Sequence, residues 1–234
     1  MFHNIVAEHV FGTMGTICWT GQLIPQVWKS WREKSTEGLA PLLVLLWGLS
    51  GPFLGVYAIL YDINIPLIVQ PQLFCMLCLI SWGQCLYYGS NRSRTTAILI
   101  TSSVIVTCGV LETIFVLVLR PFHDRGQHTP TDIFGIVASA IIAIALLPQY
   151  WEIYKHKEVI GVSMVFISID FIGAIFNDLS LVFKEELDVI AVVTYSIVVV
   201  MDGLVILAAI ILNPLARRRR RRQAAQNMVE VVYI

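Results

Sequence analysis

Apolar residues in this chain gather into seven long stretches separated by short polar segments. The stretches cover residues 9–28, 40–60, 67–88, 97–119, 132–154, 163–183 and 189–212. A helix of about 20 apolar residues crosses a hydrocarbon layer of about 30 Å. The pattern therefore predicts an all-α polytopic membrane protein with seven transmembrane helices.

Composition supports this class and narrows the function. Hydrophobic residues make up 57% of the chain and charged residues 14%, and the mean hydropathy is +0.75. Such values exclude an ordinary soluble domain. All five histidines fall in termini or loops, and no catalytic or metal-ligating arrangement can be assembled. We expect no enzyme activity, no cofactor, no resident metal and no nucleic-acid partner.

Basic residues are distributed unequally between the two faces that seven crossings define. The face with the first, third and fifth connections and the C-terminus carries thirteen of them: Lys29, Arg32, Lys34, Arg92, Arg94, Lys155, Lys157 and Arg217 to Arg222. The opposite face carries three: Arg120, Arg125 and Lys184. Because cytosolic loops are enriched in Lys and Arg, we expect a cytosolic C-terminus and a lumenal or external N-terminus.

One sequence pattern occurs twice in the chain, 123 residues apart. Pro25-Gln26 and a tryptophan at 28, followed by a short basic segment, align without a gap on Pro148-Gln149 and the following aromatic residues. Phe11-Gly12 and Lys34 match Phe134-Gly135 and Lys157 in the same register. The chain therefore contains a duplicated membrane unit.

The duplication predicts how the helices are organised. Residues 9–88 form a first triple-helix repeat, 97–119 a connector helix, 132–212 a second triple-helix repeat and 213–234 a basic cytosolic tail. Three helices invert the direction of the chain, so a fourth crossing lets the second copy enter with the same orientation. The two copies are then parallel repeats about an axis along the membrane normal.

The doubled Pro-Gln pair at the same end of two membrane helices resembles the motifs of the PQ-loop membrane proteins. This superfamily includes cystinosin, the vacuolar and lysosomal cationic amino acid exporters and, more distantly, the SWEET sugar transporters. The resemblance covers residues 9–212, and the small size and short loops are similar to those of uncharacterised fungal members. It implies transport of a small solute by alternating access about two PQ-loop hinges.

Proline chemistry gives an independent reason to treat both pairs as hinges. A proline inside a helix cannot donate a hydrogen bond to the carbonyl four residues earlier, which frees the carbonyls of Gly21 and Ile144. At membrane depth, freed carbonyls lie against protein or a water-filled cavity. We therefore expect Pro25, Gln26, Pro148 and Gln149 to form hinges that line a path, with each glutamine bonding across helices; a static kink is the alternative.

Ionisable residues inside the apolar stretches form a second set of candidates, because a charge in the hydrocarbon is unfavourable by at least a few kcal/mol. Burial favours the neutral form of a carboxyl group, so such a group can exchange protons with an acidic lumen. Each acid could instead be a structural hydrogen-bonding group. The candidates for proton coupling or substrate binding are Asp202, Asp170, Asp178 and Glu112, with Trp82 and Gln84 as further pocket candidates.

Asp202 stands out, since it lies near mid-membrane in the last helix. The resemblance implies a proton-coupling role, because cystinosin-like members carry an acid at a similar place. We therefore expect an endomembrane transporter, vacuolar or lysosomal, for an amino acid or related cation, with solute and protons as partners. Lipid handling, either phospholipid flipping or dolichol-sugar utilisation, is the alternative function. We expect the arginines at 217–222 to anchor the tail on the cytosolic side; binding of anionic lipids of the bilayer and an arginine-type retention signal are the alternatives.

Overall fold

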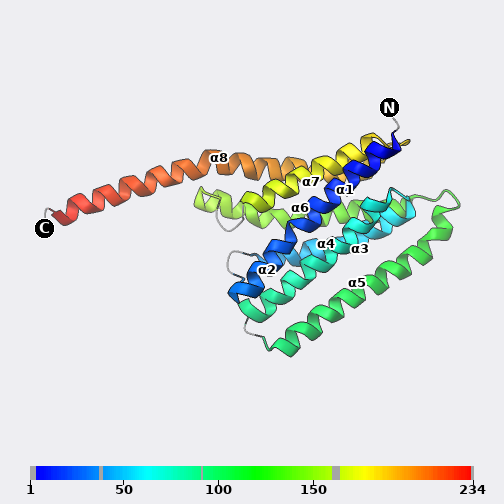
Figure 1. The fold of residues 1–234 in the computed structure, drawn as a ribbon, viewed down its shortest axis with the longest axis horizontal. Coiled ribbons are helices and arrows are strands. Elements are labelled where there is room, and N and C mark those ends of the chain that lie inside the picture. Colours follow the sequence, from blue (N-terminus) through cyan, green and yellow to red (C-terminus); the bar gives the residue numbers. More distant parts are fainter. Residues whose placement is uncertain (1–3, 37–38, 91, 160–163, 233–234) are drawn as a thin grey trace.

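A computed structural model shows a bundle of long helices (Figure 1) and describes residues 4–36, 39–90, 92–159 and 164–232. No strand occurs among these residues. The elements are α1 (Ile5–Gly21), α2 (Leu23–Glu33), α3 (Pro41–Leu60), α4 (Ile65–Gln84), the π-helical turn η1 (Cys85–Gly89), α5 (Arg94–His123), α6 (Thr129–His156), α7 (Met164–Val182) and α8 (Val189–Val232).

Local sequence explains where several helices begin. The side chains of Asn4, Asn64 and Ser93 each accept a hydrogen bond from a backbone N–H in the first turn of the next helix. Such caps satisfy N–H groups that have no partner inside the helix. Two helices therefore start at an asparagine and α5 at a serine, close to the predicted polar segments.

The predicted all-α membrane class is confirmed, with differences at the first and last helices. Six helices in the described part of the chain are long and apolar enough to cross a membrane. The predicted first crossing, 9–28, is instead divided into α1 and α2 at Gln22. Its division follows from Pro25, which leaves the carbonyl of Gly21 without a helical partner.

The last helix is longer than predicted. It was expected to end near residue 212, but α8 runs through the arginines to Val232. Arginine favours helix, so a basic segment directly after an apolar helix can prolong it. The segment 213–232 therefore forms a helical extension, and Figure 1 shows it projecting beyond the other helices.

Helix packing follows the duplication. Within the first copy α4 packs against α1 and α3, and within the second copy α8 packs against α6 and α7. Between the copies the two main interfaces are α1 with α7 and α3 with α6. Because α6 and α7 repeat α1 and α3, these interfaces are related by an approximate two-fold axis. Connector α5 lies outside, against α3 and α4 (Figure 1).

Hydrogen bonds repeat along with the helices. The hydroxyl of Thr16 lies 3.3 Å from Gln70 Oε1, and that of Ser139 lies 2.5 Å from the hydroxyl of Thr194. Thr16 and Ser139 are 123 residues apart, whereas Gln70 and Thr194 are 124 apart. Equivalent residues are thus 123 positions apart in the first helix of each copy but 124 positions apart in the third.

Small residues bring the two copies close together at the α1–α7 interface. A Cβ atom added to Gly15 would overlap the side-chain amide of Asn177, and one added to Gly173 would lie 2.5 Å from Cδ1 of Trp19. The backbones can approach this closely because both positions lack a side chain.

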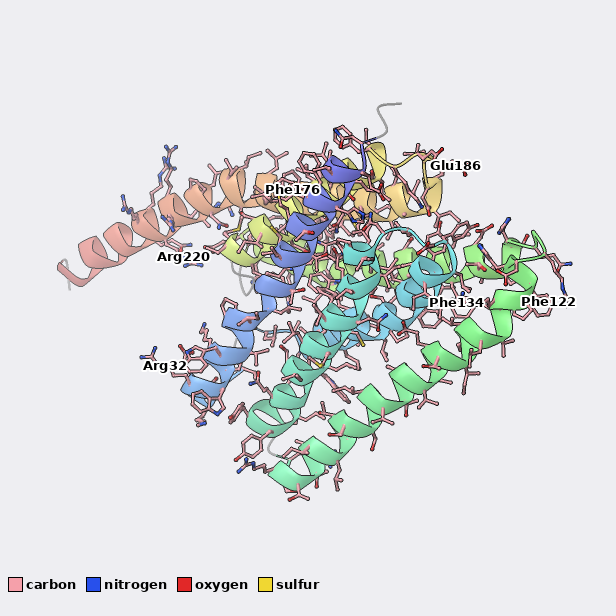
Figure 2. The ribbon with its side chains drawn as sticks, turned by 45° about the vertical axis from the view of Figure 1, so that its right-hand side comes forward. Arg32, Phe122, Phe134, Phe176, Glu186 and Arg220 are labelled. Atoms are coloured by element: carbon pink, nitrogen blue, oxygen red, sulfur yellow. The ribbon has the colours of Figure 1, made fainter. Side chains whose placement is uncertain are left out.

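The ends of the bundle differ in charge. Figure 2 shows Arg32 and Arg220 toward one end and Phe122 and Glu186 toward the other. This placement agrees with the predicted grouping of basic residues on one face. The assignment of that face to the cytosol stays a prediction.

Candidate functional site

The two Pro-Gln pairs occupy similar places in the copies but differ in helix continuity. Pro25 lies in the first turn of α2, just after the break at Gln22, whereas Pro148 lies inside the continuous α6. Both prolines are exposed, as are the neighbouring Trp28 and Trp151. The prolines therefore face outward, and the residues that reach the interior are others in the same segments.

Among the described residues, the side chain of Gln26 bonds within its own helix and not across helices. Its Nε2 atom donates to Ser30 Oγ at 3.1 Å, one turn later in the same helix. Residues four apart lie on the same helix face, which makes this local bond available. The side chain of Gln149 lies outside the described residues.

The segments after the motifs end in the same way. Lys34 and Lys157 both adopt the left-handed conformation, with φ of 54° and 52°. The Lys34 ammonium lies 4.7 Å from the centre of the Trp31 ring, and that of Lys157 lies 3.9 Å from the Tyr154 ring. The duplication thus preserves a helix end that is closed by a lysine over an aromatic ring.

A buried carboxyl group on α7 links the first motif segment to the second copy. Asp170 is 2% exposed, and its Oδ1 accepts a 2.7 Å hydrogen bond from Gln22 Nε2 at the α1–α2 break. The indole N–H of Trp19 donates to the Asp170 backbone carbonyl at 3.1 Å. The polar residue that turns inward near the first motif is therefore Gln22.

Asp202 on α8 completes a carboxyl pair with Asp170. It is fully buried, and its carboxyl group interacts with that of Asp170. Among the described residues no donor is within hydrogen-bonding distance of either Asp202 oxygen. Two buried carboxylates repel each other strongly, so at least one of them is favoured in its protonated form. The pair therefore places two ionisable groups next to each other inside the bundle.

The second motif segment lies beside the same pair. Tyr150, two residues after Pro148, donates from its hydroxyl to the backbone carbonyl of Met201 at 2.5 Å. The hydroxyl group of Tyr150 is also near enough to Asp202 for the two groups to interact. The Asp170–Asp202 pair thus lies between the two motif segments, with Gln22 on one side and Tyr150 on the other.

Only the second copy carries this pair. The position that matches Asp170 in the first copy is Trp47, 123 residues earlier. With the one-residue displacement of the third helix, the position that matches Asp202 is Cys78. Both are buried, so the first copy has an apolar core where the second has two carboxyl groups.

The remaining acidic candidates lie apart from the pair. Asp178 accepts a 3.0 Å hydrogen bond from Ser196 Oγ between α7 and α8. Glu112 on α5 accepts a 2.5 Å bond from Gln72 Nε2 on α4. Glu112 therefore connects the connector helix to the first copy, while Asp178 stays within the second.

Trp82 and Gln84 are not near the carboxyl pair either. Trp82 packs against the apolar cluster of Leu79 and Cys108. Gln84 Nε2 donates to the backbone carbonyl of Val27 at 2.9 Å, just after the first motif. Gln84 therefore holds α2 against α4.

A polar vestibule opens at the end of the bundle away from the motifs. It encloses about 620 Å³, and its lining includes four carboxyl groups and one amine: Asp132, Glu185, Glu186, Asp188 and Lys184. Tyr57 donates to Asp188, and Tyr61 donates to Asp132 at 2.5 Å. Burial and this bond raise the pKa of Tyr61, so its hydroxyl remains a donor. Acidic side chains therefore outnumber basic ones in the lining of the vestibule.

Sequence analysis assigned no role to Gln22 or to the acids of the vestibule. Gln22 is a polar residue inside an apolar stretch, and that signal could have identified it. The vestibule acids lie at helix ends and in the α7–α8 connection, where charged residues are common, so no sequence signal distinguishes them.

These features define a polytopic membrane protein built from two parallel three-helix units, with a buried carboxyl pair between the copies. The family model for the PQ loop repeat matches residues 7–67 and 131–190. The chain belongs to the PQ-loop repeat family, as its doubled motif predicts.

Relatives agree with this assignment. An uncharacterised protein of Schizosaccharomyces pombe is 38% identical over 91% of this chain and 75% of its own length. An uncharacterised membrane protein of Saccharomyces cerevisiae is 37% identical over 84% of this chain and 64% of its own length. The vacuolar histidine transporter YPQ3 of the same yeast is 28% identical over 37% of this chain and 30% of its own length.

Proposed function

We propose that the protein transports a small cationic solute, an amino acid or a related cation, across an endomembrane such as that of the vacuole, in exchange for protons. The observation that carries this proposal is the buried Asp170–Asp202 pair between the two motif segments. The similarity to a vacuolar histidine transporter supports the solute class and the compartment.

Charge along the molecule supports a cationic solute. The vestibule places four carboxyl groups and a single amine at one entrance. Further in, Asp178 on α7 and then the carboxyl pair follow. A low-dielectric entrance with one sign of charge raises the local concentration of the opposite charge. A cation thus meets carboxyl groups at each level of the bundle.

The carboxyl pair provides the coupling. When one carboxylate is ionised, a cationic group is held in place of the second proton; when both are protonated, the site is neutral and releases the cation. Gln22 and Tyr150 connect these states to the two motif segments, because each lies beside one member of the pair. Rocking of the copies about the helix break at Gln22, near Pro25, and about Pro148 within α6 would then open one entrance at a time.

Uptake by purified protein in proteoliposomes with an imposed pH gradient tests this function. The assay uses a mixed panel of amino acids and sugars and compares wild type, Asp202→Asn and Glu112→Gln. We expect gradient-driven uptake of a cationic amino acid that Asp202→Asn loses and Glu112→Gln retains. Uptake that does not respond to the gradient, or equal loss in both variants, would refute proton coupling through the pair.

A further inference from the structure

A second pocket lies at the basic end of the bundle, apart from both the carboxyl pair and the vestibule. It encloses about 440 Å³ between the end of α2, the α4–η1 junction and the first turns of α5. This volume falls in the range of small-molecule sites, about 300–1,000 Å³. Of the candidate residues selected from the sequence, only Gln84 lines it among the described residues, and Gln84 is not near the carboxyl pair.

Cationic and aromatic groups form the rim of this pocket. Among the residues that the structure describes, Lys34 and Arg94 are its charged lining residues, and none of the lining residues is acidic. The Lys34 ammonium lies between two rings, 4.7 Å from the centre of Trp31 and 5.8 Å from that of Tyr88. Aromatic residues at a membrane boundary sit at the level of lipid headgroups. The rim therefore has the composition of an anionic headgroup site.

The deeper wall is apolar. It includes Ile80 from α4 and Ile98 and Ile105 from α5. Arg94 and Ile105 are eleven residues apart on one helix, which corresponds to about 16 Å along its axis. The pocket is thus basic at one end and apolar at the other, which matches an amphipathic molecule. A free anion would leave the apolar part unfilled.

Two polar atoms between these regions have no partner. Gln84 Oε1 and Thr101 Oγ1 are buried, line the pocket and lack a hydrogen-bond partner within the described residues. Buried polar groups are normally paired. The helix also widens here into the π-helical turn η1, a distortion that is frequent at functional sites.

We propose that this pocket binds one anionic glycerophospholipid. Its phosphate lies between Lys34 and Arg94, its polar backbone region lies near Thr101, and an acyl chain follows the groove between α4 and α5. The lipid fills the interface between the connector helix and the first copy. This proposal is independent of the transport function.

The second copy offers a matched comparison. Lys157 repeats Lys34 in sequence, in its left-handed backbone conformation and in its aromatic partner. The connector α5, however, packs against α3 and α4 of the first copy, so the pocket forms beside Lys34. Removing charge at Lys155 and Lys157 changes the net charge of the same face without changing the pocket.

Spin-labelled lipids in phosphatidylcholine vesicles provide the test. Electron paramagnetic resonance measures the motionally restricted fraction of labelled phosphatidylserine and of labelled phosphatidylcholine around the reconstituted protein. We expect wild type to favour phosphatidylserine, and Lys34→Gln/Arg94→Gln to reduce this preference by about thirtyfold, since each of the two cations near a membrane contributes about 1 kcal/mol. Lys155→Gln/Lys157→Gln should retain the preference.

A second pair of variants tests the acyl-chain groove. Ser102 lines the pocket from α5, while the adjacent Ser103 is exposed and does not line it. Ser102→Trp should lower phosphatidylserine binding, and Ser103→Trp should leave it unchanged. Equal loss in both charge variants would indicate general electrostatic attraction. Equally strong competition by soluble glycerophosphoserine would indicate a site for free anions, and either result would overturn the proposal.

Discussion

Two glutamines four residues apart, Gln22 and Gln26, make different contacts, and only the one outside the PQ motif joins the two copies. Gln26 belongs to the motif, is only half-buried and bonds to Ser30 in its own helix. Gln22 lies before the motif, is 3% exposed and bonds to Asp170 in the other copy. We therefore predict that Gln22→Leu destabilises the protein more than Gln26→Leu does.

The geometry sets the size of the difference. A hydrogen bond to a charged group contributes about 1.5–3 kcal/mol, and an ordinary one about 0.5–1.5 kcal/mol. The Gln22–Asp170 bond is short at 2.7 Å, and both partners are buried. Its loss should lower stability by about 2 kcal/mol, whereas the Gln26–Ser30 bond should account for less than about 1 kcal/mol. Leucine fits both apolar surroundings, so its packing adds little.

Thermal unfolding of the two purified variants in the same detergent measures this difference. A chain of this size loses about 2–4 °C per kcal/mol, so we expect a fall of about 4–8 °C for Gln22→Leu and about 3 °C or less for Gln26→Leu. If Gln26→Leu falls as far as Gln22→Leu, the motif glutamine has a partner that this structure does not contain, and the assignment of Gln22 as the positioning residue fails.

Two further predictions concern the interface and the entrance. Gly173→Leu should lower stability by about 1–3 kcal/mol because its side chain would overlap Trp19, whereas Gly109→Leu, with no atom within 4 Å of its Cβ position, should be neutral in the same unfolding assay. Asp188→Asn should raise the KM of a cationic solute by about fivefold without changing kcat, as expected for about 1 kcal/mol of charge attraction. Asp124→Asn, on the same end but outside the vestibule lining, is its control, and equal effects of the two would contradict a local role.

The helices could be predicted from the sequence because each depends on a local signal. Long apolar runs fix a membrane span whatever surrounds them, and the doubled Pro-Gln pair reveals the duplication without an alignment. The carbonyl freed by Pro25 was expected at Gly21, and the helix is broken directly after that residue. The extension of α8 was not expected, because a run of arginines is compatible with both a helix and an extended tail.

The candidate site depended on contacts that sequence spacing does not show. Asp170 and Asp202 could be selected as ionisable residues in apolar helices, but their pairing depends on how α7 and α8 pack. Gln22 reaches Asp170 across 148 positions of sequence, through an interface between the copies. Glu112, selected by the same rule as Asp202, binds Gln72 on the outer side of the bundle. Burial alone therefore does not distinguish the acids of the proposed coupling site from an acid that only joins two helices.

Contacts between the copies near the vestibule show how duplication constrains the molecule. Asn64 Nδ2 donates to Ser180 Oγ at 3.1 Å, and Tyr57 donates to Asp188. Ser180 follows Tyr57 by 123 residues and Asp188 follows Asn64 by 124, so the same contact is made twice with different chemistry. Only one of the two brings a carboxyl group to the entrance.

The two copies also combine shared and different features deeper in the bundle. Both copies keep a proline near the end of the first helix and a lysine that closes the following segment. Only the second copy has the carboxyl pair, and the connector helix packs mainly against the first. In the transport mechanism that we propose, a symmetric frame permits both copies to move alike, while the single carboxyl pair between them responds to that movement once per cycle. This arrangement gives a reason for the apolar Trp47 and Cys78 at the matching positions: a second buried carboxyl pair would add a desolvation penalty without adding a second path.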